Sequence, residues 1–157
     1  MNKLSILLQQ LHIDTNQAFS QADITRVVVH HDSRYTFYIS SPELMPLDNV
    51  KALKEAQHLF PYPCEFLFET TSNHFREEDV IEYSDYIMHH VLGNVPEMQS
   101  MTRDDMDLKD NILTLHTVNH IQCDSIKTQL NEMRTLLSGF GINIDLRAEV
   151  DADNHEY

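Results

Sequence analysis

Histidines are the residues of this chain with the clearest potential for metal chemistry. There are ten of them, and neutral imidazole is the commonest metal ligand among side chains. His30-His31 and His89-His90 are adjacent pairs, whose side chains diverge on a strand or a helix. Only His116 and His120 have the spacing of a ligand pair, and no cysteine or carboxylate lies at a diagnostic distance from them. We therefore expect neither a metal nor a cofactor.

The densest carboxylate cluster could bind a hard cation such as calcium. It consists of Asp104, Asp105, Asp107 and Asp110. A calcium loop that began at Asp105 would have Asp110 in place of the sharp-turn glycine and His116 in place of the bidentate glutamate. The pattern rejects an EF-hand and predicts a solvated acidic loop.

Nucleophiles and phosphate-binding loops have little support in the sequence. Cys64 and Cys123 are isolated thiols, typical of reduced cysteines in the cytoplasm, and nothing beside them supports a Cys-His nucleophile. The three glycines, Gly93, Gly139 and Gly141, suit helix ends better than a phosphate cradle, and Gly-x-Ser-x-Gly is absent. We expect no independent catalysis by this chain.

The charge balance bears on the kind of partner that the chain can bind. Eleven Lys and Arg stand against 25 Asp and Glu, for a formal net charge of −14. Phosphate-rich ligands are bound mainly through Lys and Arg, so nucleic-acid binding is disfavoured. An acidic surface suits a basic protein partner or serves solubility alone. No apolar run reaches the length of a membrane span, so we expect no membrane contact and a cytoplasmic location.

The elements of the first half follow from hydrophobic periodicity. Leucines at helical spacing predict a first helix, and Asp14 or Thr15 can cap a short second helix. Two β-branched and aromatic arms, residues 25–30 and 34–39, predict a hairpin with its turn between them. A helix before Pro61 and a strand at residues 64–69 complete an α-α-β-β-α-β lobe over residues 1–72.

The second half predicts an α-β-α-β lobe over residues 73–150. A helix ends at Gly93, and Asp110-Asn111 forms a turn before a strand at residues 112–118. Asp124 or Ser125 can cap the next helix, and a last strand follows Gly141. Residues 151–157 form an acidic tail or linker. The fold class is α+β, with two small α/β lobes that each pack a small sheet against helices.

Several segments of the first half resemble the start of Gram-positive DNA polymerase III of the PolC type. Chains of that family begin with a Leu/Gln-rich helix, a Phe-x-x-Ala-Asp/Glu-Ile-like element, a Val-x-Val-His strand, a Ser-Arg-aromatic-x-Phe arm and a Leu-Pro entry to a helix. The similar positions in this chain are residues 7–10, 19–24, 27–30, 33–37 and 43–46. The resemblance is close over the first half and loose afterwards.

The resemblance implies a non-catalytic interaction module. The parent chain would be a DNA-directed DNA polymerase with a 3′–5′ exonuclease, whose catalytic segments are absent here. The first lobe would hold the clamp-loader tau subunit, and the second is similar to small KH-like folds but lacks their Gly-x-x-Gly loop.

On the first lobe we expect a partner surface of aromatic, basic and apolar side chains, which commonly anchor interfaces. Its residues are His30, Arg34, Tyr38, Leu4 and Leu8. Two alternatives remain open: a module that binds single-stranded nucleic acid, and a small metal-dependent enzyme.

Overall fold

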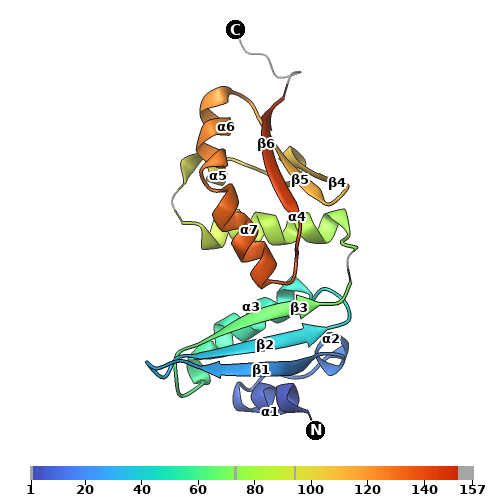
Figure 1. Ribbon diagram of the computed structural model, residues 1–157, viewed down its shortest axis with the longest axis vertical. Helices are drawn as coiled ribbons and strands as arrows, with labels where there is room; N and C mark the ends of the chain where they lie inside the picture. Colours follow the sequence, from blue (N-terminus) through green and yellow to red (C-terminus); the bar gives the residue numbers. More distant parts are fainter. Residues whose placement is uncertain (1, 73, 94, 152–157) are drawn as a thin grey trace. The chain divides into compact units, whose positions relative to one another are not determined.

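The computed structural model describes residues 2–72, 74–93 and 95–151, which fall into two compact units (Figure 1). The first unit is Met1–Asn73 together with the turn Gly139–Gly141, and the second is His74–Ser138 with Ile142–Tyr157. Both are mixed α/β units with a three-stranded sheet and helices, so the predicted fold class is confirmed. Within residues 151–157, the expected acidic tail, everything after Asp151 lies outside the described residues.

The first unit has the predicted α-α-β-β-α-β order. Its elements are α1 (Lys3–Gln10), α2 (Gln17–Ser20), β1 (Asp23–Val29), β2 (Tyr35–Ser41), α3 (Leu47–Ala56), the 3₁₀ turn η1 (Gln57–Leu59) and β3 (Cys64–Thr70). The strand order is β1-β2-β3, with β1 antiparallel to β2 and β2 parallel to β3. Because β2 and β3 run in the same direction, α3 provides the crossover between them (Figure 1).

Asparagine side chains cap the first two helices of this unit. The Asn2 side chain accepts a hydrogen bond from the Ser5 amide (2.8 Å) and caps α1. Asn16, rather than Asp14 or Thr15, caps α2 by accepting from the Phe19 amide (3.0 Å). The amide side chain of Asn16 also pairs with that of buried Asn49 in α3, at 3.0 and 3.1 Å. This pairing joins the start of α2 to α3.

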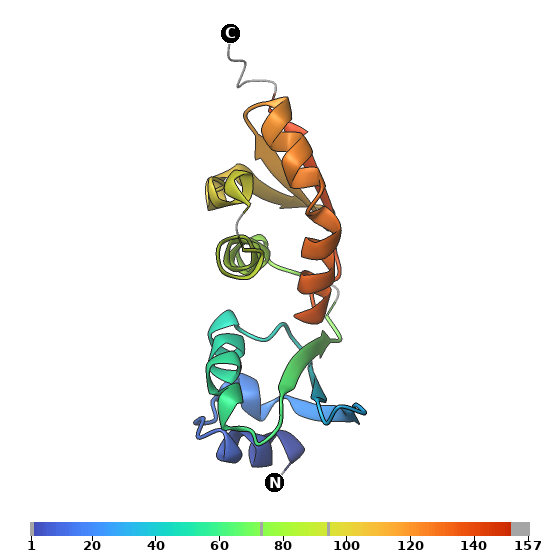
Figure 2. The same ribbon diagram turned by 90° about the vertical axis from the view of Figure 1, so that its left-hand side faces the viewer.

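The core of the first unit lies between the sheet and its helices. Figure 2 shows α3 on one side of the sheet, and α1 buries three leucines. The buried side chains include Leu4, Leu7, Leu8, Leu11, Phe19, Ile24, Phe37, Ile39, Val50, Leu53, Phe66 and Phe68. Removal of this apolar surface from water is the main stabilising contribution to the unit.

The second unit is built on a second three-stranded sheet. Its elements are α4 (Glu77–Tyr86), the π-helical turn η2 (Ile87–Val91), α5 (Pro96–Gln99), the 3₁₀ turn η3 (Arg103–Asp105), β4 (Met106–Lys109), β5 (Ile112–Thr117), α6 (His120–Lys127), α7 (Leu130–Gly139) and β6 (Asp145–Val150). β4 pairs antiparallel with β5, and β5 pairs parallel with β6. Each unit therefore contains an antiparallel hairpin, a helical crossover and a third strand parallel to the second.

The strand β4 was not expected, because its residues lie among the aspartates that predicted an acidic loop. Met106 is buried opposite Leu115, and half-buried Leu108 pairs with Leu113. Asp107 between them is exposed, as alternation along a strand requires. Of the four aspartates, only Asp107 therefore lies in this strand, at an outward position, while Asp104 and Asp105 lie in η3 and Asp110 lies in the turn after β4. The predicted turn at Asp110-Asn111 is confirmed, and both residues have positive φ (54° and 61°).

The single helix expected after Asp124 or Ser125 is two helices. α6 begins earlier, at His120, because the Asn119 side chain accepts from the Gln122 amide (2.8 Å) and caps it. α6 ends at Lys127. The hydroxyl of Thr128, its C-cap residue, donates to the Ser125 carbonyl (2.6 Å), a local bond that competes with helix continuation. The connection from Thr128 to α7 contains no glycine, so it has no Gly-x-x-Gly loop.

None of the helices in the described ranges has both the length and the apolar character needed to cross a membrane.

Candidate interaction surface

The hairpin of β1 and β2 has two chemically different faces. Along β2, Tyr35, Phe37 and Ile39 point to the side that holds the core, while Thr36 and Tyr38 point to the other side. The loop that joins the strands, residues 30–34, is closed by the Ser33 amide donating to the His30 carbonyl (3.0 Å), with Ser33 at φ 64°. The predicted division of the second arm into two faces is confirmed.

An aromatic cluster forms the core face at the loop end of the hairpin. Tyr35 stacks on Tyr62 (ring centroids 5.3 Å apart, 15° between planes), and Phe60 meets Tyr35 edge-on at 5.1 Å. Phe37 stacks on Phe66 at 5.7 Å. Such ring pairs add about 0.5–1.5 kcal/mol each beyond the burial of their area. The cluster therefore holds β2, β3 and the segment after η1 together as a stiff platform.

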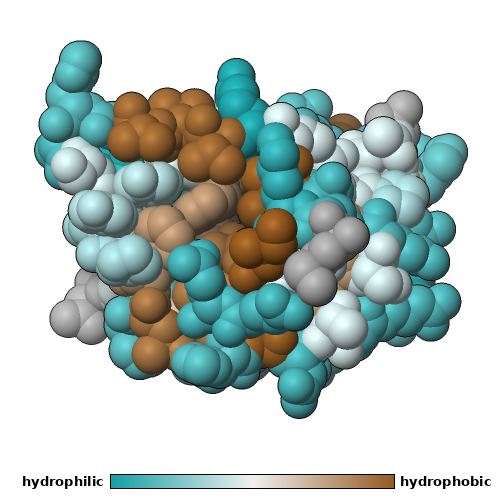
Figure 3. Space-filling view, turned by 90° about the horizontal axis from the view of Figure 1, so that it is seen from below, coloured by the Kyte–Doolittle hydropathy of each residue, from teal (hydrophilic) through white to brown (hydrophobic). Residues whose placement is uncertain are grey.

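Exposed apolar side chains extend this platform to the surface. Val27 and Val29 of edge strand β1 are 40% and 58% exposed, although they point to the same face as Phe37 and Tyr35. Ile6 on α1, Leu59 in η1 and Tyr62 are also exposed large hydrophobic residues. Figure 3 shows this side of the first unit, where brown side chains gather toward the hairpin loop and border a shallow hollow. Exposed apolar side chains that gather on one side of a domain are typical of interaction sites.

The other face of the hairpin carries a polar network. The Thr36 hydroxyl, which is buried, donates to Glu65 Oε1 (3.0 Å) and lies 2.9 Å from His30 Nε2. Because that hydroxyl has one proton, His30 Nε2 is the donor of the second bond. The Arg26 guanidinium lies over the Tyr38 ring, 4.0 Å from its centroid. These contacts fix the orientation of both the histidine and the tyrosine.

Two sequence-predicted site residues lie on this polar face and a third lies at its end. His30 and Tyr38 take part in the contacts just described, and exposed Arg34 forms an ion pair with Asp32 (3.8 Å) in the hairpin loop. An exposed ion pair of this kind contributes little to stability, so Arg34 can exchange Asp32 for a partner group at low cost.

Leu4 and Leu8, the predicted apolar contacts on α1, lie elsewhere. Their side chains are 0% and 3% exposed, because the hydrophobic face of α1 packs into the core. Neither side chain is available to a partner at the surface, where Ile6 is the exposed apolar residue of the helix. Sequence reasoning missed Val27 and Val29 as surface residues. The sequence carried no signal for their exposure, because the edge position of β1 is a property of the assembled sheet.

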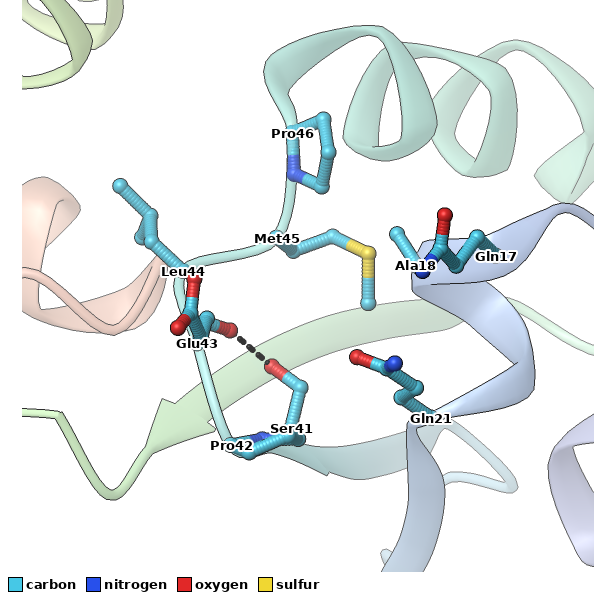
Figure 4. A pocket seen from close by; sticks show the side chains of 9 residues that line it. All are labelled: Gln17, Ala18, Gln21, Ser41, Pro42, Glu43, Leu44, Met45 and Pro46. Carbon is cyan, nitrogen blue, oxygen red and sulfur yellow. Dashed lines mark hydrogen bonds between the residues drawn. The ribbon is translucent and has the colours of Figure 1, made fainter.

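A pocket of the first unit lies at the opposite end of β2 from the hairpin loop (Figure 4). It has a volume of about 290 Å³ and is lined mainly by the ends of β2 and α2 and the segment before α3. The Ser41 hydroxyl donates to the Glu43 carbonyl (2.5 Å), and Met45 extends toward Gln17 and Ala18. Glu43 is its one ionisable lining residue. With neither a nucleophile–base pair nor a cationic group, this pocket offers no catalytic arrangement.

The remaining candidates for chemistry are used in structural contacts. His116 Nε2 lies 2.8 Å from Asp107 Oδ2 across β4 and β5, and His89 Nδ1 lies 3.0 Å from Asp85 Oδ1 within one helical turn. Within residues 2–72, 74–93 and 95–151, no three His, Cys, Asp or Glu side chains are grouped to hold a metal ion. Burial raises the pKa of the Cys64 thiol, which is opposite to the shift that activates a nucleophilic cysteine.

Comparison with protein families places the first unit. Residues 3–58 match the family model described as DNA polymerase III polC-type N-terminus I. Over residues 3–58 the first unit is therefore similar to the non-catalytic N-terminal part of a PolC-type DNA polymerase III, an enzyme of DNA replication. The match covers α1 to α3 and includes no residue of the second unit. No curated protein matches the chain.

Proposed function

We propose that this chain is a non-catalytic docking module of a PolC-type DNA polymerase III, and that its first unit binds the clamp-loader tau subunit in the cytoplasm. The observation that carries the proposal is the exposed apolar surface of the first unit. Three of its residues, Ile6, Val27 and Val29, fall within the matched segment 3–58. A stiff aromatic platform with exposed aliphatic side chains can bind a partner without a large ordering cost.

The polar face of the hairpin supplies a second set of contacts for the partner. Arg34 and Tyr38 are the residue types that most often dominate binding energy, and His30 lies beside them. In this proposal Leu4 and Leu8 support the surface from the core, and Ile6 takes their place in contact with tau.

Calorimetric titration of the chain with the C-terminal domain of its cognate tau subunit tests the proposal. Single-stranded DNA serves as the parallel titrant. We expect saturable binding of tau and none of DNA, because 25 acidic side chains oppose a phosphate backbone. Binding of DNA alone would favour a module that binds nucleic acid. If neither tau nor DNA bound, the assignment of tau as the partner would be wrong.

A variant that carries both Arg34→Ala and Tyr38→Ala tests the polar face. Hot-spot residues each contribute about 2 kcal/mol or more, so we expect the affinity for tau to fall by more than about tenfold. A loss of less than about threefold would remove this face from the interface.

A further inference from the structure

The strand β1 forms a free edge of the first sheet, because the strand order is β1-β2-β3. The His30 amide donates to the Arg34 carbonyl (2.8 Å), which makes these two residues a hydrogen-bonded pair. Bonded and non-bonded pairs alternate along an antiparallel ladder, so Val28 and Arg26 direct their backbone groups to β2. The N–H and C=O groups of Val27 and Val29 therefore point away from the sheet, toward the side where a further strand would pair.

The same two valines present apolar side chains at this edge. They are 40% and 58% exposed, and Val29 lies opposite Tyr35, which stacks on Tyr62. A strand added at the edge would place every second side chain on this apolar face. Natural sheets usually protect such edges with charges, prolines or a covering element. Here the loop half of the edge carries two exposed valines instead.

The polar face of β1, opposite the face with the two valines, differs from that face in its charge. Residues 25–34 contain two cationic side chains, Arg26 and Arg34, and one carboxylate, Asp32, which is paired with Arg34. The guanidinium of Arg26 is held over Tyr38 on the polar face, the face that also carries His30. In a chain of net charge −14 this is a locally cationic strip, and it complements acidic side chains.

We propose that the edge of β1 is a docking site for an extended segment of a partner protein, which adds as a strand and alternates apolar with acidic side chains. The apolar side chains contact Val27, Val29 and the Tyr35–Tyr62 stack, and the acidic ones face Arg26. Backbone bonds give such a complex affinity, and the alternate side chains give it specificity. The inference rests on the proposed docking role of the first unit but not on tau as the partner.

A second copy of this chain is a poorer occupant of the edge. If two β1 strands paired antiparallel about a two-fold axis perpendicular to the sheet, the polar faces of both copies would lie on the same side of the joined sheet. Arg26 of both copies would then share the polar face with no added carboxylate to neutralise them. The charge pattern therefore favours a different, acidic segment.

The test is an NMR titration of the full chain with three short capped peptides, one alternating Val and Glu, one alternating Val and Lys, and one with Val and Glu in separate blocks. We expect the alternating Val/Glu peptide to shift the amide signals of Val27 and Val29 and to bind at least about tenfold more tightly than the others. Arg26→Glu should reverse the preference between Glu and Lys. Equal binding of the three peptides, or no shift along β1, would overturn the proposal.

A matched pair of variants distinguishes peptide binding at the β1 edge from nonspecific hydrophobic binding. Val29→Lys places a charge on the edge, whereas Val118→Lys places one on a comparably exposed valine of the second unit (50% exposed). Only Val29→Lys should abolish peptide binding, and equal effects of both would contradict the assignment. The same variants are titrated with the tau domain. Failure of the unmodified chain to bind tau removes the proposed function, while the peptide result alone decides the edge.

Discussion

Thr36 illustrates how much one buried hydroxyl contributes on the polar face of the hairpin. It lies between His30 and Glu65 and is 2% exposed. Thr36→Val keeps the shape but removes both hydrogen bonds, so we expect the free energy of unfolding to fall by about 1–2 kcal/mol. Urea denaturation followed by circular dichroism measures this. Thr25→Val on the exposed edge is the control, and equal losses for the two variants would argue against the network.

Tyr83 makes the stability of the second unit depend on alkaline pH. Burial, with the charges of Glu82 and Asp79 nearby, raises the pKa of this phenol above its ordinary value near 10. The unfolded chain then loses the Tyr83 proton at a lower pH than the folded chain does. The stabilisation is therefore complete below about pH 10 and declines as the pH rises further.

Replacement of that phenol tests the sign of the effect. Between about pH 9.5 and 11, the free energy of unfolding should fall less for Tyr83→Phe than for the unmodified chain. The slopes of the free energy of unfolding against pH should differ between the two chains by up to about 1.4 kcal/mol per pH unit. Denaturation series across this pH range give both slopes. Identical slopes would contradict the assignment of the raised pKa to Tyr83.

Among the elements, the β4–β5 hairpin has a turn whose geometry favours glycine. Asp110 and Asn111 form a two-residue loop with φ of 54° and 61°, as a type I′ turn requires. Asn111→Gly creates the favoured Asp-Gly pair, and we expect it to raise the free energy of unfolding by about 0.5 kcal/mol. Asn111→Val should lower it by about 1–2 kcal/mol, because a β-branched residue is strained at positive φ. Thermal denaturation ranks the three chains, and a reversed order would exclude strain at this turn.

The elements that the sequence predicts well are those with strong local signals. The leucine-rich first helix, the hairpin and the Asp110-Asn111 turn all have periodicity or turn residues that specify them. Strand β4 was missed because its alternation of apolar and polar residues is short and lies among aspartates. Only pairing with β5 stabilises it as a strand. The break between α6 and α7 was missed because Thr128 competes for a carbonyl without disturbing the apolar stripe.

The location of the partner surface stays a prediction, but the structure shows how its candidate residues lie. The aromatic and basic residues of the second arm indicated the hairpin, and the structure places Tyr38 and His30 on its polar face. Burial of Leu4 and Leu8 depends on how α1 meets the sheet, which helical periodicity alone does not specify. Exposure of Val29 likewise depends on β1 lying at an edge, which is a property of the assembled sheet.

For the molecule as a whole, charge is divided unevenly. Residues 1–73 carry 5 Lys or Arg against 8 Asp or Glu, whereas the remainder carries 6 against 17. The second unit therefore holds most of the net charge of −14, and repulsion among its carboxylates opposes folding. The near balance of the first unit suits a surface that contacts a partner through apolar groups.

Salt should therefore stabilise the chain. Raising NaCl from about 20 mM to about 500 mM shortens the screening length from about 20 Å to about 4 Å, and we expect a higher midpoint of thermal unfolding. Asp124→Lys, an exposed change in the second unit, should reduce this response by lowering the net charge. A midpoint that stays constant or falls with salt would show that repulsion is negligible.

The shared strand plan of the two units has a consequence for synthesis. In each sheet the second strand lies between a hairpin partner made just before it and a parallel partner made only after a helical crossover. As the chain leaves the ribosome, the hairpin of β1 and β2 can form early. The edge of β2 that pairs with β3 stays open until Cys64–Thr70 has emerged. The nascent first unit thus passes through a stage with two open strand edges, when protection by a chaperone matters most.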